Sequence, residues 1–135
     1  MAHDLYNNVK ATVGTAPVSP AATGTITGTV VDTSAFRTNT VFISAGAQTT
    51  TGITVTPVVL SGTATGSLAS CDASELIGTE AGAALDGTAG ASSTSKIGYI
   101  GTDRYVRCDI IVTAAATGVY SAQWIQSDPV KAPQS

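Results

Sequence analysis

Apolar and polar residues alternate along several short segments of this chain that are rich in Val, Ile and Thr. From Tyr105 to Thr113, for example, every second position is apolar, as at Val106 and Cys108. A period of two is typical of a β-strand with one buried face, and β-branched residues favour pleated sheets over helices. We therefore expect the following strands: Thr25–Val31, Thr40–Ala45, Ile53–Val59, Gly66–Cys71, Lys96–Ile100, Arg104–Thr113 and Val119–Gln126.

Turn-forming residues separate these segments. The turns are expected at Asp32–Ser34, Gly46–Gln48, Ser61–Gly62, Gly101–Asp103 and Thr117–Gly118. Short strands with regular turns predict an all-β fold, a single antiparallel β-sandwich or jelly roll over residues 24–127. Only Ala73–Leu85 tolerates a helical turn, and Gly78 and Gly82 weaken it.

Two terminal segments lie outside this expected domain. Residues 1–23 predict an extended N-terminal arm whose apolar side chains, such as Leu5, Tyr6, Val9 and Val13, have no obvious place in a sheet. Residues 128–135, DPVKAPQS, predict an extended C-terminal tail punctuated by proline. Chain ends of this kind are often disordered, but the apolar residues of the arm favour docking on a partner.

The charge of the chain limits the classes of partner. Charged residues make up 11% of the sequence and the net charge is −3, whereas soluble domains usually carry about 25% charged residues. Either Thr, Ser and Gly keep the chain soluble, or partners cover much of its surface. The acidic balance argues against nucleic-acid binding. We find no apolar run of the about 18 residues that a membrane span needs, and no secretion signal in MAHDLYNNVK, so synthesis in the cytoplasm is expected.

The sequence gives little support to catalysis. His3 is the only histidine and lies near the chain start, where a catalytic group is difficult to position. Asp72, Glu75 and Glu80 could hold a cation, but they lack the ligand pattern of a calcium loop, so a solvated acidic edge is favoured. The glycines form no phosphate-binding motif. We expect no enzyme activity, no metal and no cofactor.

The two cysteines, Cys71 and Cys108, could in principle form a disulfide. The alternation places Cys108 on the apolar face of its strand, and a cytoplasmic origin favours a reduced, buried thiol. Two cysteines cannot by themselves decide between these alternatives.

The segment Lys96–Thr113, KIGYIGTDRYVRCDIIVT, concentrates basic and aromatic residues and is expected to form two strands joined by a tight turn. Tyr105 and Arg107 should share one face while Arg104 points to the other. Arg and Tyr are enriched in protein interfaces, so this cluster could dock on a partner. In the simpler alternative, Arg107 pairs with Asp109 on the same face of an ordinary hairpin.

The chain resembles a family of small proteins of tailed bacteriophages and related prophages, usually encoded beside the major capsid protein. The similarity covers nearly the whole chain and rests on DLYNNVK (Asp4–Lys10), ELIGTEAGAAL (Glu75–Leu85), and KIGYIGTDRYVRCDIIVT followed by TGVYSA (Lys96–Ala122). Its most specific part is GYIG-x-x-RYVR. The chain departs from the family pattern at Asp103, where a lysine often stands, and at Cys108, usually an apolar residue. The first departure makes the turn less basic and weakens the argument for an interface there.

The resemblance implies a virion structural protein on the capsid exterior that decorates or cements the shell, with the major capsid protein as partner and no catalytic residues. A homo-oligomer is expected, with a trimer favoured. The alternatives are a tail-tube or head–tail joining protein, and an exterior module that binds a host surface or glycan. The residues expected to contact the capsid or other copies are Leu5, Tyr6, Asn7, Asn8, Val9, Lys10, Arg104, Tyr105 and Arg107.

Overall fold

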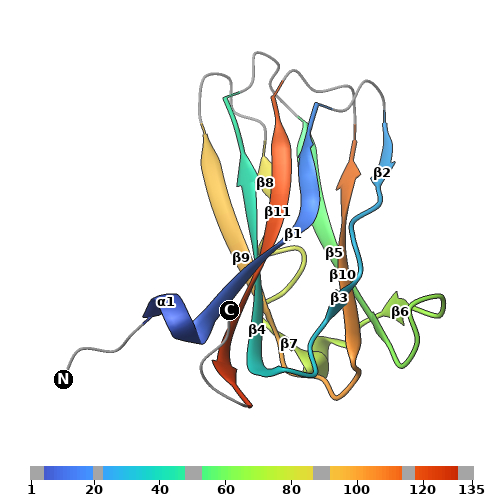
Figure 1. Cartoon of the computed structure of the whole chain (residues 1–135). Coiled ribbons are helices and arrows are strands. Elements are labelled where there is room, and N and C mark those ends of the chain that lie inside the picture. The colour runs from blue at the N-terminus through green and yellow to red at the C-terminus, as the bar shows by residue number, and fades with distance from the viewer. Residues whose placement is uncertain (1–4, 20–22, 48–52, 87–91, 114–117, 131–135) are drawn as a thin grey trace.

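A computed structural model of the chain describes residues 5–19, 23–47, 53–86, 92–113 and 118–130. Its strands form two antiparallel sheets packed face to face (Figure 1). Sheet A contains, in spatial order, β1 (Val9–Val18), β11 (Tyr120–Pro129), β4 (Phe36–Ala45), β9 (Ser93–Tyr99) and β7 (Leu76–Ile77). The architecture confirms the predicted all-β antiparallel sandwich, and the jelly-roll alternative is not confirmed.

Sheet B is built around two long central strands. Its spatial order is β2 (Gly24–Ile26), β10 (Tyr105–Val112), β5 (Thr54–Gly62) and β6 (Ala69–Ser70), and in addition β3 (Val31–Asp32) pairs with β10 and β8 (Leu85–Asp86) pairs with β5. The helical elements are short. They are α1 (Leu5–Asn8) and a 3₁₀ turn, η1 (Ala73–Glu75), which lies within the segment expected to tolerate a helical turn.

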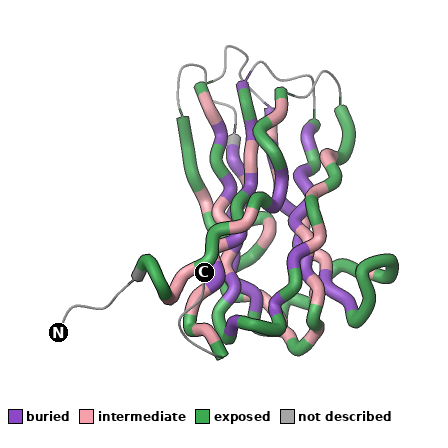
Figure 2. The backbone as a smooth tube through the Cα atoms, in the orientation of Figure 1, coloured by how far each residue is buried: buried purple, intermediate pink, exposed green. Residues whose placement is uncertain are grey.

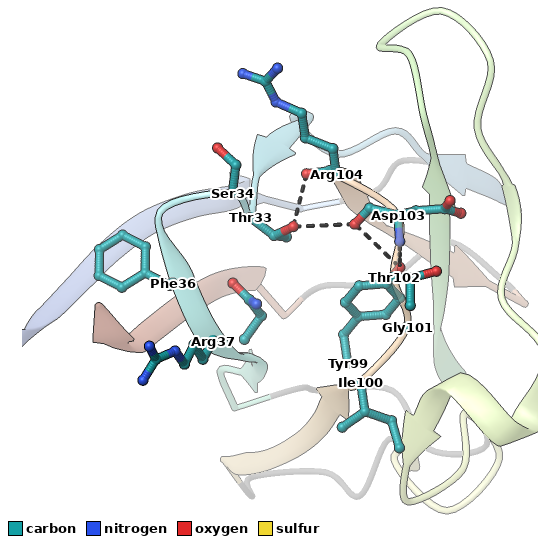
Figure 3. Close-up of a pocket in the computed structure, with 11 residues that line it drawn as sticks. Thr33, Ser34, Phe36, Arg37, Tyr99, Ile100, Gly101, Thr102, Asp103 and Arg104 are labelled. Carbon is teal, nitrogen blue, oxygen red and sulfur yellow. Dashed lines mark hydrogen bonds between the residues drawn. The ribbon is translucent and has the colours of Figure 1, made fainter. Parts of the chain in front are cut away.

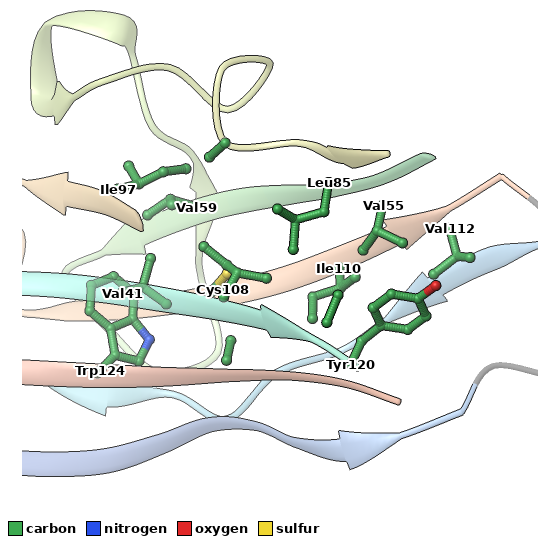
Figure 4. Close-up of a cluster of buried hydrophobic side chains, with 14 of the residues drawn as sticks. Val41, Val55, Val59, Leu85, Ile97, Cys108, Ile110, Val112, Tyr120 and Trp124 are labelled. Atoms are coloured by element: carbon green, nitrogen blue, oxygen red, sulfur yellow. The ribbon is translucent and has the colours of Figure 1, made fainter. Parts of the chain in front are cut away.

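The alternation in the sequence produces the core directly. On β4, Val41 and Ile43 are buried while Thr40 and Phe42, which point to the other face, are half-buried. Figure 2 shows the same alternation along the central strands, and Figure 4 shows the buried side chains that meet between the sheets. Trp124 and Tyr120 of β11 are the largest of these and are fully buried. One cluster therefore joins both sheets into a single core.

The expected hairpin in Lys96–Thr113 is wrong. β9 pairs with β4 and β7 in sheet A, whereas β10 pairs with β5, β2 and β3 in sheet B. Between Tyr99 and Tyr105 the chain therefore crosses from one sheet to the other. The buried Tyr99 hydroxyl accepts a hydrogen bond from the Asp103 backbone N–H at 3.0 Å and so holds the corner of this crossing. Both strands bury their apolar faces between the sheets. The period-two pattern is therefore the same as in a hairpin, and it does not show that the two strands belong to different sheets.

The prediction that residues 1–23 form an arm outside the sheets is also wrong for much of the arm. Val9–Val18 is a full strand that pairs with β11 from Val9↔Ser127 to Val18↔Tyr120. The pairing shifts register on both sides of Thr15, and Gly14 and Thr15 are both buried. These irregularities break the period-two pattern and explain why the sequence did not indicate a strand. At the other end, β11 continues to Pro129, so the strand extends into the expected tail.

The bounds of the other strands differ from the predicted ones. The expected strand Thr25–Val31 is divided into β2 and β3, because Gly28 donates its backbone N–H to the Asp109 carboxylate at 2.9 Å instead of joining the ladder. A side chain at Gly28 would collide with the carbonyl of Cys108, so only glycine fits there. The expected strand Gly66–Cys71 is reduced to β6, and the other expected strands are present with shifted ends.

Candidate protein-interaction surfaces

The predicted site residues Tyr105 and Arg107 lie at the start of β10, where the chain enters sheet B, and Arg104 directly precedes this strand. The Arg104 guanidinium lies 5.1 Å from the centre of the Tyr105 ring. Its Nη2 and Nε donate to Oδ2 of Asp32 on β3 at 2.8 and 3.1 Å. The hydrogen bonds from Arg104 hold the pKa of the Asp32 carboxyl well below its usual range, and the same hydrogen bonds raise the pKa of Arg104. Arg104 thus has an internal partner although its side chain is exposed.

Arg107 pairs with Asp109, as the simpler of the two alternatives predicts. Its Nη2 donates to Oδ2 of Asp109 at 2.9 Å, and its Nε lies 2.8 Å from Oδ1 outside hydrogen-bonding direction. Asp109 is only 7% exposed and also accepts the Gly28 N–H. Asp109 therefore connects Arg107 of β10 to the segment that separates β2 from β3. Tyr105 and Arg107 share the outer face of the strand, as predicted.

The predicted residues at the N-terminus lie on the other sheet. Leu5, Tyr6, Asn7 and Asn8 form α1, which projects from the sandwich beside β1 and β11 (Figure 1). Tyr6 is 89% exposed. Val9 and Lys10 already belong to β1 and pair with Ser127 and Gln126. The structure thus places the N-terminal group at the edge of sheet A and the arginine cluster on sheet B.

A polar depression of about 450 Å³ lies at the corner where the chain crosses between the sheets (Figure 3). The Thr33 hydroxyl donates to the carbonyl of Arg104 at 2.9 Å, and Ser61 donates to the Asp103 carboxylate at 2.9 Å. Figure 3 shows the hydroxyls of Thr33 and Tyr99 directed at the backbone of the crossing. These polar groups hold the corner together, so the depression is best understood as part of the scaffold.

The acidic residues considered for a cation have other partners. Glu75 accepts the backbone N–H of Asp72 at 3.0 Å at the start of η1, and Glu80 accepts the N–H of Val59 at 2.7 Å between β6 and β8. In the described ranges, no group of three or more His, Cys, Asp or Glu residues could hold a metal ion. His3, the only histidine, lies outside the described residues.

Both cysteines are free thiols. Cys108 is fully buried, as predicted, and burial raises the pKa of its thiol to about 12. Cys71 is half-buried beside the edge of β5, and burial raises its pKa as well. A disulfide between the two is thus excluded in this structure.

The charged and aromatic residues of the sequence do not indicate the outer face of sheet A, because this face is mostly uncharged. In the described strands of this sheet, Lys96 is the one outward-facing residue with a charge. The outward-facing residues are Val9, Ala11, Val13, Thr38, Thr40, Phe42, Ser44, Ile77, Thr94, Lys96, Gly98, Ser121, Gln123, Ile125 and Ser127. The period-two pattern that predicts the core also predicts this set, because the residues that alternate with the core positions point outward.

A shallow apolar hollow of about 420 Å³ lies on this outer face, lined by Thr40, Phe42, Ile77, Gly78, Lys96 and Gly98. Gly98 of β9 is buried because the side chain of Ile77 lies over it, so that a Cβ at this position would be 3.1 Å from Cβ of Ile77. Ile77 is 62% exposed. The hollow and the half-buried apolar side chains around it form a surface suited to another protein.

No family model and no curated protein matches this chain. In the part of the chain that the structure describes, no helix has the length and apolar character needed to cross a bilayer.

Proposed function

We propose that this chain is a non-enzymatic structural protein of a tailed-phage virion that decorates the capsid shell and stabilises it. The sequence resemblance supports this role, and so does the low charge of the chain, because a surface that meets other proteins needs few charges. A cement protein acts by burying surface across neighbouring shell subunits. It stabilises the assembled shell because it binds the assembled state in preference to the dissociated subunits.

The observation that carries the proposal is the position of α1. This single turn projects from the sandwich, and its Tyr6 is 89% exposed although an aromatic ring is costly to leave in water. It belongs to the DLYNNVK segment on which the resemblance partly rests. A rigid two-sheet body that presents a projecting aromatic residue is suited to attachment, since Tyr is among the residues that anchor interfaces.

Attachment to undecorated shells tests the proposal. Because β1 begins at Val9, removal of residues 1–6 leaves the sandwich intact. We expect this deletion, and Tyr6→Ala alone, to weaken binding about tenfold or more, the loss typical of a buried aromatic anchor. The double change Arg104→Ala/Arg107→Ala should weaken binding less, since both arginines already have carboxylate partners within the molecule. Sedimentation of shells with bound protein measures the occupancy.

A matched control is Ile111→Ser, which removes an exposed apolar residue from β10 of sheet B, the sheet that does not carry α1. It should leave occupancy unchanged. Wild-type occupancy of both the deletion and Tyr6→Ala would reject α1 as the attachment element. Failure of the wild-type protein to bind shells, with binding to tail tubes or to glycans instead, would replace the proposal by the corresponding alternative.

A further inference from the structure

The outer face of sheet A is a large uncovered surface. In the described part of the chain, the fold has two layers and no third layer packs on this face. The four longer strands β1, β11, β4 and β9 give it about 600 Å² of flat area, from a strand spacing of about 4.8 Å and a rise of about 3.3 Å per residue. Each partner in a specific, stable interface buries about 600–1,000 Å², so this face reaches the lower end of that range.

The register across the sheet lines up outward residues in rows. One row runs Ala11, Ile125, Thr40, Gly98 and Ile77 across the strands. The next row contains Gln123, Phe42 and Lys96 on β11, β4 and β9. In the first row, Thr40 of β4 lies between Ile125 of β11 and Gly98 of β9. In the second row, Phe42 lies between Gln123 of β11 and Lys96 of β9.

This arrangement is complementary to itself. A two-fold axis parallel to the strands and passing along β4 brings β11 of one copy over β9 of the other. Ile125 then lies opposite Gly98 of the second copy, where it meets the hollow of about 420 Å³ and the side chain of Ile77 that covers this glycine. Phe42 and Thr40 lie at the axis and face their own equivalents. Packed sheets rotate by about 30°, which moves a contact one strand from the axis by only about 2 Å.

Charge also favours a second copy as the occupant. With this axis, Lys96 faces the uncharged Gln123 of the other copy, so the two lysines do not meet. The remaining outward residues of the described strands in this sheet are apolar or neutral. Homodimer interfaces are more apolar than other surfaces, and a two-fold interface requires one patch that fits itself. We infer that the outer face of sheet A binds a second copy of this chain, with β4 along the two-fold axis and Ile125 packed against Ile77 at the hollow of the second copy.

This inference does not depend on a virion role and is tested in solution with the full chain. Light scattering coupled to size exclusion should give twice the chain mass of 13.4 kDa for the wild-type protein. Ile125→Lys should weaken dimerisation about 100-fold, as expected when a central apolar contact is lost twice in one interface. The matched control is Ile111→Lys, an outward isoleucine on β10 of sheet B that is 41% exposed. It should remain a dimer.

The register is tested by an exposed residue whose replacement does not disturb the core. Gln123→Glu places a carboxylate opposite Lys96 of the second copy, and Gln123→Lys places a like charge there. We expect the first to tighten and the second to weaken dimerisation, each about 3- to 10-fold because the contact occurs twice. Sedimentation equilibrium measures both constants. Equal constants for the two variants would overturn the proposed register.

Crosslinking locates the axis. In a Cys71→Ser background, Thr40→Cys should give a covalent dimer with a short bis-maleimide, since facing sheets lie about 10 Å apart. Thr56→Cys on the outer face of sheet B should give none. A wild-type protein that is monomeric at every concentration, or a dimer that persists in both Ile125→Lys and Gln123→Lys, overturns the inference. A monomer whose Ile125→Lys variant loses shell binding would assign this face to the shell instead, which also overturns it.

Discussion

The outer faces of the two sheets have the same secondary structure but use their polar residues differently. On sheet B, Arg107 pairs with Asp109, and Arg104 pairs with Asp32 beside Tyr105. These carboxylates also accept backbone N–H groups from Gly28 and Ser34. On sheet A, the outward residues of β4 and β11 are Thr, Ser, Gln, Ile and Phe. One face is therefore fastened by internal ion pairs, while the other carries apolar and neutral side chains.

The difference shows that a cluster of charged residues in a strand is a weak indicator of docking. An arginine with a carboxylate partner in its own molecule gains little from a second partner, and it must lose water to reach one. A neutral, partly apolar face has no such cost and gains from every apolar atom removed from water. The outer face of sheet A, on which Lys96 is the one charged residue of the described strands, is for this reason the better candidate for a permanent contact.

The largest expected effect concerns the orientation of β10, on which the description of sheet B depends. Cys108 lies between Arg107 and Asp109 but points into the core, and burial raises the pKa of its thiol to about 12. Since only the thiolate reacts, that shift alone lowers reactivity at neutral pH about 1,000-fold relative to the ordinary value of 9.0. We expect Cys108 to resist a thiol reagent in native buffer, whereas the half-buried Cys71 reacts first.

Mass spectrometry after timed labelling measures the two sites separately. The matched control is the Cys71→Ser variant, which should show no labelling without denaturant and one label after unfolding. Rapid native labelling of Cys108 would mean that the inner and outer faces of β10 are exchanged, and the comparison of the two sheets would then fail.

A smaller effect is expected from the ion pair that fastens sheet B. Asp109→Ala removes the partner of Arg107 and the acceptor of the Gly28 N–H in one step. The loss of a nearly buried carboxylate with two partners should lower the free energy of unfolding by about 2–3 kcal/mol. Denaturation with urea, followed by circular dichroism, measures this change.

Two controls bound this value. Asp109→Asn keeps an acceptor for the Gly28 N–H and should lose about half as much stability, because only the ionic part is removed. On sheet A, Ser44→Ala changes an exposed outward residue and should stay within about 0.5 kcal/mol of the wild-type protein. Equal losses at Asp109 and Ser44 would show that the polar residues of sheet B do not stabilise the fold.

Much of the fold could be predicted from the sequence, because strands buried on one face carry a period-two pattern. The core positions on β4, β5, β10 and β11 follow it throughout. The edge strand β1 could not be recognised, since its register shifts around Gly14 and Thr15 break the pattern. The segment between Tyr99 and Tyr105 predicts a hairpin, because Gly101 and Asp103 are typical of tight turns, whereas the crossing depends on long-range strand pairing that the segment does not contain.

The candidate surfaces were predictable to a lesser degree. Tyr6 is 89% exposed, and docking through the N-terminal residues stays a prediction. The partners of Arg104 could not be predicted, because Asp32 lies far from it in the sequence and meets it only through the pairing of β3 with β10. The hollow over Gly98 depends on β7 pairing beside β9, which two residues of sequence cannot indicate.

The smallest expected effect is the acid dependence of the exposed pair on sheet B. The Arg104 hydrogen bonds depress the pKa of Asp32 in the folded state from its model-compound value of 3.8. Above that value Asp32 is charged in both states and the pair contributes its full stability. As the pH falls from about 5 to 2, the unfolded chain binds the proton first, so this contribution is lost. Removal of the partner by Arg104→Ala should lower stability slightly at neutral pH and make the acid loss shallower, because both side chains are largely exposed. Urea denaturation across this pH range measures the slope.

Arg37→Ala provides the matched control, since Arg37 lies 3.8 Å from Asp128 in a looser exposed pair, and the slope of this variant should equal that of the wild-type protein. If Arg104→Ala also kept the wild-type slope, the Asp32 pair would not fasten sheet B, and the contrast between the faces would depend on Arg107 and Asp109 alone.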